Sequence, residues 1–485
     1  MEPSFFNSLG NCKGPAKKST RVKPGDSRPI FEFTFTDNLT FSRRATPSLR
    51  VAPDCSAVQF EVDFAPIARG MQRHLSALEA DFLWLASAVY FADRSALRYP
   101  YGKGGPSHWR RRIHVTLPMI EASHWSFVEA PLVRALEFLT EDDWTFEFRS
   151  GRTEFAAELQ KHFPDIHPPE VNWTSLFSGG LDSLAGALRW FFKTEGVGQL
   201  VSGQTHHRMA VGQNTQAAHL RESFAGRVEH VNFCYGFTDK QCSGLIGLDS
   251  SQRTRAFVHT ALGALAALRA GNSELLLFEN GVGALNLPCD SSQIGSMNSR
   301  GTHPLFLNRM AQFVSDAFSQ RFSISNPFWL MTKAQMLLGD SVQQHSFLLD
   351  HSFSCDRFPN YKHRETQCGC CPSCLIRRLA FHGAGLSENP KNYSTDVLKF
   401  QRPLCDAEIQ SIYKLNIQAG TLAACMEEKD PWIALCAVWP DMLRAELELG
   451  FDAERLAIVK LFARHVEEWK SFSQSFDSNI LALAA

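Results

Sequence analysis

The stretch that decides the fold is residues 178–183, Ser-Gly-Gly-Leu-Asp-Ser. It directly follows the apolar segment 173–177 (WTSLF), which has the composition of a buried strand, and it precedes a predicted helix from Asp182. Two glycines allow a tight turn and let backbone N–H groups approach an anion closely, because neither carries a Cβ. Two serine hydroxyls add donors, and the helix N-terminus adds unpaired amides and a favourable dipole. The order strand, glycine loop, helix therefore predicts a phosphate- or pyrophosphate-binding loop; the alternative is an ordinary capped helix.

Outward from this loop, short apolar segments alternate with helical patterns. The loop has neither the Gly-Lys-Ser/Thr ending of a P-loop NTPase nor a GxGxxG fingerprint. Alternating strands and helices indicate an α/β fold, with a parallel sheet covered on both faces. Strands are predicted at 173–177, 199–203, 230–235 and 274–280, and helices from 182, around 217–224 and over 256–270.

Five of the thirteen cysteines lie between residues 355 and 374. Cys368, Cys371 and Cys374 follow one another at two successive C-x2-C spacings, and Cys355 can supply a fourth thiolate. Four thiolates make a closed tetrahedral Zn²⁺ site, which is structural because no coordination position stays open. A reducing compartment favours this zinc knuckle over disulfides, a redox pair or an iron–sulfur cluster, the alternatives for the same residues. Cys370 is left as a spare thiol.

The composition is that of an ordinary globular chain. Its 485 residues carry 49 Lys and Arg against 50 Asp and Glu, a formal net charge of −1. This balance excludes binding through bulk positive charge, so nucleic acid is not a favoured partner. Since no window approaches the ~18 uninterrupted apolar residues of a membrane span and no secretory signal is recognised, we expect a cytoplasmic protein without a membrane partner. The basic cluster at 109–112 is predicted to be a solvated strand edge; contact with nucleic acid or an acidic partner is the alternative.

The sequence divides into four parts. Residues 1–27 are polar and are predicted to be a mobile lead, and residues 28–160 show the mixed strand and helix patterns of an N-terminal α+β domain. Three prolines at 162–170 mark the next boundary. Residues 161–385 hold the α/β domain with the cysteine cluster, and residues 386–485 form a helical C-terminal region.

The motif SGGxDS at the end of a first strand resembles the PP-loop ATP pyrophosphatases, which have an adenine nucleotide alpha hydrolase-like fold. In that family ATP is cleaved between its α and β phosphates. AMP is placed on a substrate oxygen, pyrophosphate leaves, and a nucleophile then displaces AMP. The resemblance implies that ATP and Mg²⁺ bind here and that Asp182 is catalytic. It assigns to the ATP and pyrophosphate site Ser178, Gly179, Gly180, Leu181, Asp182 and Ser183.

This motif together with the cysteine pattern SC…CGxCxxC-L-x-R-R resembles QueC, the 7-cyano-7-deazaguanine synthase family, over residues 171–385. In QueC four cysteines bind Zn²⁺ and the substrate is 7-carboxy-7-deazaguanine. The resemblance implies that Gly203 and Gln204, close to a histidine, belong to the nucleotide site. It also implies that Lys333, in a P…TKA segment, is catalytic and neutralises a phosphate or the departing pyrophosphate; an exposed helix lysine is the alternative.

The sequence departs from QueC where that family has its substrate-contacting stretch. Glu279 and Asn280 stand there, at the C-terminal end of a predicted strand, where open α/β sheets bind ligands. A carboxylate and an amide at this place can recognise a guanine-like edge through paired hydrogen bonds, and loop capping is the alternative.

Four further residues are predicted to contact substrate. Arg253 and Arg255 precede a long apolar helix and can clamp a carboxylate or a phosphate, or they can be solvated. Arg300 and His303 belong to an SR-x-T-HP segment beside the predicted cleft.

The ENG…LN-P and SR-x-T-HP segments, with the long N-terminal region, resemble QueC-like proteins of bacterial antiphage defence systems, such as the QatC component of Qat systems and the QueC-like component of some CBASS operons. The resemblance implies ATP-dependent adenylation of a 7-deazapurine carboxylate, followed by transfer to ammonia or to an amine of a protein from the same operon. The alternatives are a tRNA-modifying PP-loop enzyme or queuosine-pathway nitrile synthase, and a non-catalytic nucleotide-binding subunit.

Overall fold

The computed structural model describes residues 7–8, 30–35, 48–49, 56–57, 60–63, 75–98, 110–151, 170–237, 249, 251–289, 299–358, 367–399 and 404–476. Most of the predicted mobile lead at 1–27, and all but the last residue of the proline-containing boundary at 162–170, lie outside the described residues.

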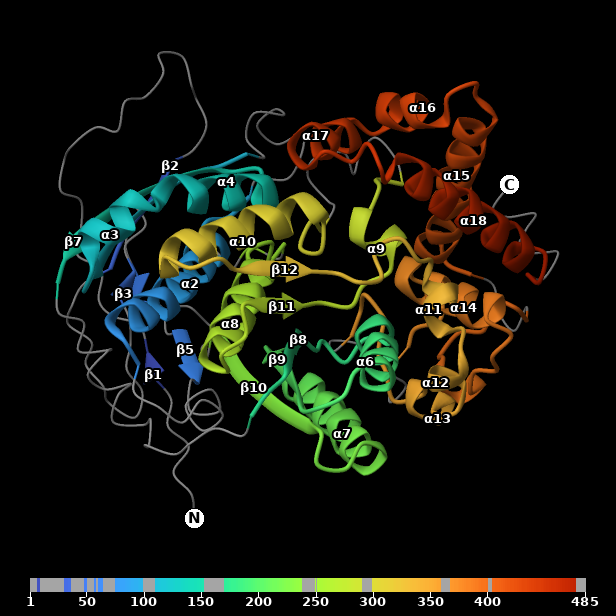
Figure 1. The fold of residues 1–485 in the computed structure, drawn as a ribbon. Helices are drawn as coiled ribbons and strands as arrows, with labels where there is room; N and C mark the ends of the chain where they lie inside the picture. The colour runs from blue at the N-terminus through green and yellow to red at the C-terminus, as the bar shows by residue number, and fades with distance from the viewer. Residues whose placement is uncertain are drawn as a thin grey trace.

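Among the described residues, the largest sheet has seven strands, in the spatial order β1 (Asn7–Ser8), β5 (Phe60–Asp63), β10 (Val228–Phe237), β9 (Gly198–Gln204), β8 (Trp173–Leu176), β11 (Glu274–Leu276) and β12 (Ser323–Ser325). The strands from β10 to β12 are parallel to their neighbours. β5 and β1 continue this sheet in antiparallel orientation. The predicted α/β fold with a parallel sheet is therefore confirmed, and Figure 1 shows the parallel strands from β10 to β12 near the centre, with β5 and β1 to their left.

Helices cover both faces of the large sheet. α6 (Leu181–Lys193) and α7 (His207–Ser223) lie on one face, and α8 (Arg255–Arg269) lies on the other. Alternate residues of β11 point to opposite faces, so Leu275 joins the core around α8 while Leu276 joins the core around α6. The chain passes from β8 to β9 on one side and later to β11 on the other. Open α/β sheets usually bind ligands where the chain changes direction in this way, which is at the C-terminal ends of β8 and β11.

The N-terminal part of the chain forms a second sheet from three parallel strands, β2 (Ile30–Thr34), β6 (Arg112–Met119) and β7 (Asp143–Ser150). Its helices are α2 (Ala77–Ser95), α3 (Ala122–Phe127) and α4 (Glu129–Thr140), and a separate short pair is β3 (Ser48–Leu49) with β4 (Ser56–Ala57). Trp144, Phe146 and Phe148 stack in a row along β7, with ring centroids 6.0 and 5.6 Å apart. β5, from the same part of the sequence, pairs with β10, so the N-terminal part contributes to both sheets.

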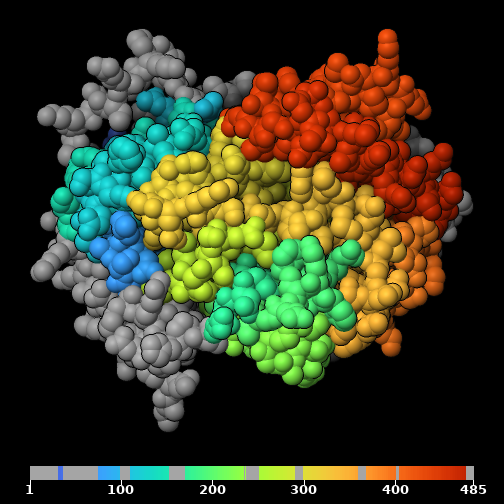
Figure 2. Space-filling model, viewed as in Figure 1, coloured from blue at the N-terminus to red at the C-terminus, as the bar shows by residue number. Residues whose placement is uncertain are grey.

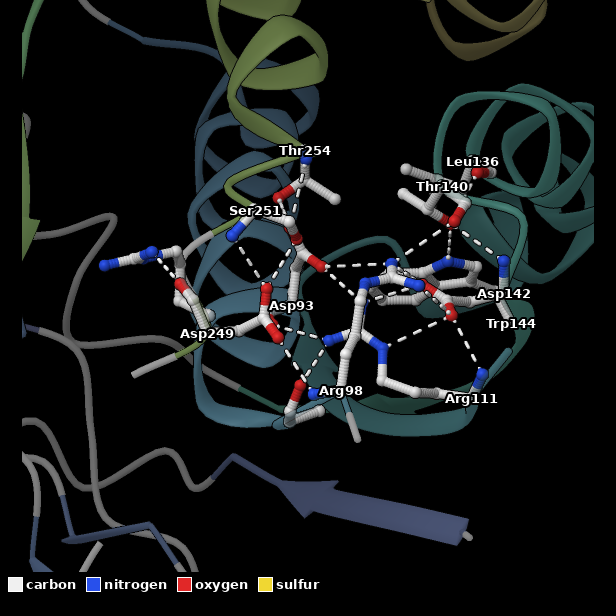
Figure 3. Close-up of polar contacts among 12 residues, drawn as sticks. Asp93, Arg98, Arg111, Leu136, Thr140, Asp142, Trp144, Asp249, Ser251 and Thr254 are labelled. Carbon is white, nitrogen blue, oxygen red and sulfur yellow. Dashed lines mark hydrogen bonds and ion pairs between the residues drawn. The ribbon is translucent and has the colours of Figure 1, made fainter. Parts of the chain in front are cut away.

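The prediction that the basic cluster at 109–112 is a solvated strand edge is wrong for Arg111, whereas residue 109 lies outside the described residues. Arg111 is completely buried and forms ion pairs with Asp93 and Asp142 (Figure 3). Arg110 is exposed and pairs with Asp143. The sequence pattern could not reveal this, because the aspartates lie 18 and 31 residues from Arg111 along the chain.

Among the described residues, the remaining elements are all helical. They are α9 (Gly281–Leu285), α10 (Pro304–Phe318), α11 (Lys333–Leu337), α12 (Asp340–Gln343), α13 (Ser346–Leu349), α14 (Pro372–Gly383), the 3-10 helix η3 (Pro390–Asn392), α15 (Asp406–Glu427), α16 (Pro431–Val438), α17 (Pro440–Leu449) and α18 (Arg455–Ser473). α15 and α18 pack against α14, and α18 also contacts α9. In Figure 2 the yellow surface around α10 lies between the N-terminal part and the red C-terminal helices.

Candidate functional site

The 178–183 loop joins β8 to α6 at the C-terminal edge of the large sheet. Gly179 has a φ of +79°, in the left-handed region that favours glycine. The Ser178 hydroxyl oxygen accepts a hydrogen bond from the Gly180 N–H at 3.2 Å and lies 3.1 Å from the Ser183 hydroxyl. Since the N-cap residue is Gly180, no side chain caps α6. The first amides of the helix are therefore available to an anion, as the sequence predicted.

Side chains on two other segments hold this loop in place. From α7, the Gln213 amide donates to the Ser178 carbonyl at 3.0 Å, and the Gln216 amide donates to the Gly179 carbonyl at 2.9 Å. Phe353 covers the other side, and a Cβ at Gly179 would lie only 2.6 Å from its ring. The sequence interpretation missed these three residues; the available signal was a pair of glutamines three residues apart on a helix.

Beside the loop, the structure brings together four of the predicted site residues. Asp182 in the first turn of α6 forms an ion pair with Lys333, the first residue of α11. The Asn280 amide donates to Asp182 at 3.1 Å and to Glu279 at 2.8 Å. The Asn280 side-chain oxygen also accepts from the Gly283 N–H at 2.9 Å, so this residue caps α9 while it orients both carboxylates.

The site raises the pKa of both titratable neighbours of Asp182, which favours the neutral form of Glu279 and the charged form of Lys333. Burial, together with the negative charge of Asp182, raises the pKa of Glu279 to about 8, although Lys333 acts against this shift. Burial disfavours the charged form of Lys333, but Asp182 and Glu279 outweigh it and raise the pKa of the ammonium group. Near neutral pH the site therefore holds the Lys333 cation next to the loop and a Glu279 carboxyl group that is mostly protonated.

A cavity of about 420 Å³ opens on this charged group, and we call it the lysine cavity. Its polar wall contains Asp182, Glu279, Asn280 and Lys333. The C-terminal helices also line it, with Leu415 of α15 and Phe462 of α18 among the lining residues. The C-terminal helical region thus forms part of the site.

A second cavity, of about 430 Å³, lies against the same loop on the side of β9, and we call it the arginine cavity. Gly203, Arg253, Arg255 and His259 line it, together with apolar side chains of β8 and β9. The two cavities share the serines of the loop and Glu279. Two ligand groups bound in these cavities would therefore meet at the 178–183 loop.

The predicted nucleotide residues of β9 lie at the end of that strand. Gly203 lines the arginine cavity, and a Cβ there would lie 2.3 Å from the His259 ring, so the position has no room for a larger residue. Gln204 is buried at the last position of β9. His206 caps α7 by accepting the Arg208 N–H at 3.1 Å.

Arg253 and Arg255 line the arginine cavity, and their role in holding an anion stays a prediction. Burial, reinforced by the like charge of Arg98, lowers the pKa of Arg253 to about 10. A bound anion would reverse this shift, because a negative charge compensates the cost of burying a guanidinium group.

Arg300 and His303, also predicted to contact substrate, have local partners. Arg300 lines the arginine cavity, but its guanidinium group pairs with Glu141 at 2.8 Å and with Asp441 at 2.5 Å. His303 caps α10 through the Leu305 N–H at 3.1 Å and is buried, which lowers its pKa to about 4. These contacts join the N-terminal part, α10 and α17. Contact of Arg300 or His303 with a substrate stays a prediction.

The four cysteines chosen from their spacing come together in one buried cluster. The four sulfur atoms all lie within 4.8 Å of one another, with Cys368 to Cys374 and Cys355 to Cys371 both at 3.9 Å. Ligands at about 2.3 Å from a tetrahedral zinc lie ~3.8 Å apart, so the cluster fits this ion. Cys370 lies outside the set, with its sulfur 3.3 Å from a Glu408 oxygen.

The cysteine cluster is linked to the 178–183 loop through Arg377. This buried residue of α14 donates to the Ser352 hydroxyl at 2.6 Å and to the Leu349 carbonyl at 2.9 Å. Ser352 precedes Phe353, whose N–H donates to the Gly179 carbonyl at 3.2 Å. The four-cysteine segment therefore supports the covering of the loop, and its residues Pro372, Ser373 and Ile376 also line the lysine cavity.

These features define a parallel-sheet α/β protein with a candidate ligand site at the edge of the sheet and a four-cysteine cluster that could hold a metal ion. Residues 301–385 match the family model described as queuosine biosynthesis protein QueC. Over this segment the chain is QueC-like, as the sequence motifs predicted. The matched segment contains Lys333 and the four cysteines, whereas the 178–183 loop precedes it. No curated protein sequence matches the chain. In the part of the chain that the structure describes, no helix is both long and apolar enough to cross a membrane.

Proposed function

We propose that this QueC-like protein is a PP-loop enzyme that uses ATP to adenylate a carboxylate on a 7-deazaguanine-like base. The acyl group is then transferred to a nitrogen nucleophile, either ammonia or a protein amine. The observation that carries this proposal is the ion pair of Lys333 with Asp182 directly beside the uncapped start of α6. A cation and free amides at one point suit a pyrophosphate group.

The two cavities suggest how the ligands divide. The pyrophosphate end of ATP lies at the 178–183 loop and Lys333, with Mg²⁺ accompanying the phosphates. The adenosine end occupies the arginine cavity, whose apolar side chains from β8 and β9 suit a base. The carboxylate substrate enters the lysine cavity, where Glu279 and Asn280 meet the edge of the base. Each cavity has the size of ordinary small-molecule sites, about 300–1,000 Å³.

Two bond exchanges make up the reaction. A substrate carboxylate oxygen attacks the α-phosphorus, and the bond from that phosphorus to the bridging oxygen of the β-phosphate breaks, so that pyrophosphate leaves. The nitrogen of a neutral amine then attacks the acyl carbon, the bond from that carbon to the AMP oxygen breaks, and AMP leaves with the electron pair while the nitrogen releases one proton. Lys333 stabilises the leaving pyrophosphate, and Asp182 positions the lysine.

The proposed setting is a bacterial antiphage defence system in the cytoplasm, where the thiols of the cysteine cluster stay reduced. Its partners are a small 7-deazapurine carboxylate and a protein acceptor from the same operon. Nucleic acid is not a favoured partner, and the burial of Arg111 removes one charge from the basic cluster that would have supported it.

The test is pyrophosphate release from ATP with and without 7-carboxy-7-deazaguanine. We expect release to depend on this compound and to fall by at least about a hundredfold in Asp182→Ala, the size of loss typical for preorganised electrostatic groups. Full release by Asp182→Ala would contradict the assignment of the loop. Release that needs tRNA would favour a tRNA-modifying enzyme, and ATP binding without release would favour a non-catalytic subunit. A base-sized mass increase on a co-expressed operon protein identifies the acceptor.

A further inference from the structure

We infer that the N-terminal part of the chain is a component of the ligand site, because α2 and the ion pairs around it hold residues 251–255 as one wall of the arginine cavity. Asp93, Arg98 and Asp249 are then positioning residues. This inference rests on the proposed function only in naming ATP as the ligand. Figure 3 shows the contacts, which join α2, the segment before α8 and the start of β6.

Asp249 fastens the beginning of the wall to the end of α2. One carboxylate oxygen accepts the backbone N–H of Arg98 at 2.8 Å, and the other accepts the backbone N–H of Ser251 at 2.9 Å. The backbone N–H of Asp249 donates to the Arg94 carbonyl at 2.8 Å. Since Ser251 lines the arginine cavity, a single side chain ties the cavity wall to the helix.

Asp93 fastens the other end of the wall. One of its oxygens accepts both the backbone N–H and the hydroxyl of Thr254, at 3.0 and 2.9 Å. Thr254 is the N-cap residue of α8, but its side chain makes no capping hydrogen bond to that helix. Its hydroxyl donates to Asp93 of α2. Arg253 and Arg255, the two cationic residues of the wall, flank this anchored position.

Two buried arginines hold Asp93 in its charged form. Arg111 and Arg98 both lie between Asp93 and Asp142, with Arg111 at 2.5 and 2.6 Å from the two carboxylates. Burial opposes ionisation of Asp93, but Arg111 and Arg98 outweigh it and lower its pKa. A charged aspartate accepts stronger hydrogen bonds than a neutral one, so both hydrogen bonds from Thr254 to Asp93 are strengthened.

The far end of α8 is anchored to the same helix. Arg269 in the last turn of α8 pairs with Glu79 in the first turn of α2 at 2.9 Å, and the side chains of both residues are buried. Tyr90 of α2 adds a bond from its hydroxyl to the side chain of Gln252 at 3.4 Å. α2 therefore fixes α8 at both ends, and the position of Arg253 and Arg255 follows from the N-terminal part.

The experiment replaces Asp249 by Ala in the full chain and measures ATP-dependent pyrophosphate release together with amide hydrogen exchange. We expect the KM for ATP to rise by about tenfold, since hydrogen bonds to a charged group are lost, while kcat stays within about threefold. The amides of residues 251–256 should exchange faster, and those of α6 should not. Thr254→Val, which keeps the backbone bond to Asp93, should give a smaller change of the same kind.

Arg110→Ala is the matched control, because it removes an exposed ion pair of the same part of the chain. It should leave both the KM and the exchange unchanged. Unchanged KM and exchange in Asp249→Ala would overturn the inference, as would an equal loss of kcat and of protection throughout the chain. If the unmodified protein releases no pyrophosphate, the proposed function fails, but the exchange measurement still decides whether α2 holds the wall. If Asp249→Ala does not fold, the KM for ATP and the amide exchange of Thr254→Val test the inference instead.

Discussion

Glu279 is a buried carboxyl group that the folded protein keeps protonated at higher pH than the unfolded chain does. Its pKa rises from the ordinary 4.5 to about 8 because of burial and the charge of Asp182. The folded state therefore binds this proton more tightly, and the group destabilises the fold increasingly as pH rises from about 4.5 to about 8. The destabilisation is complete above that range.

Glu279→Gln should consequently become more stable than the unmodified protein as pH rises. The glutamine cannot ionise, so the difference in melting temperature between variant and unmodified protein should grow over this range and level off above about pH 8. Thermal unfolding followed from about pH 5 to about pH 9 measures it. A difference that stays constant, or shrinks as pH rises, would contradict the burial of a shifted carboxyl group at this position.

Gly179 is the second residue whose surroundings lead to a specific prediction. Its φ is positive and an added Cβ would lie 2.6 Å from the Phe353 ring, so there is no place for a side chain. Gly179→Ala should therefore lower pyrophosphate release more than tenfold, because even a displacement of about 1 Å can cost ~100-fold in rate. Gly420→Ala is the control: that glycine lies inside α15 with nothing within 4 Å of the added methyl, and alanine there should slightly stabilise the helix.

At the scale of elements, the sequence predicted the order of strands and helices but not where two of them begin and end. The helix predicted around 217–224 starts ten residues earlier, at His207. Its first half has no apolar stripe, because the buried positions there are Gln213 and Gln216, which hold the loop carbonyls. The strand predicted over 274–280 ends at Leu276. The polar residues Glu279 and Asn280 follow outside the strand and line the lysine cavity.

The four-cysteine cluster, which we propose binds zinc, is the element whose disruption has the most direct consequence. Cys371→Ser should lose the bound zinc and lower the melting temperature, because three thiolates leave the tetrahedral site open. Pyrophosphate release should fall as well, since Arg377 connects α14 to the segment that covers Gly179. Metal analysis by mass spectrometry and thermal unfolding measure the effect. Cys436→Ser, a half-buried cysteine outside the cluster, should keep both the zinc and the activity.

At the scale of the whole molecule, the N-terminal part and the α/β part share one hydrophobic core. Phe82 of α2 stacks on Phe313 of α10 at 5.8 Å between ring centroids and meets the edge of Phe318 at 5.1 Å. The same core extends to residues of the C-terminal helices, such as Leu422 and Leu461. Contacts between residues this far apart in the sequence leave no local pattern. The periodicity of apolar residues therefore predicted each helix, but it did not predict which other elements the helix packs against.

Phe82→Ala should therefore destabilise the N-terminal part and the α/β part together. Loss of a fully buried phenylalanine costs about 3–5 kcal/mol, and a shared core transmits this cost to both parts. We expect a single unfolding transition at lower denaturant concentration, with the amides of α2 and α10 losing protection from exchange to the same extent. Phe127→Ala removes a ring that is 86% exposed, and it should change stability by no more than about 0.5 kcal/mol. If α2 lost protection while α10 kept it, the two parts would have separate cores and the N-terminal part could not hold the wall of the arginine cavity rigidly.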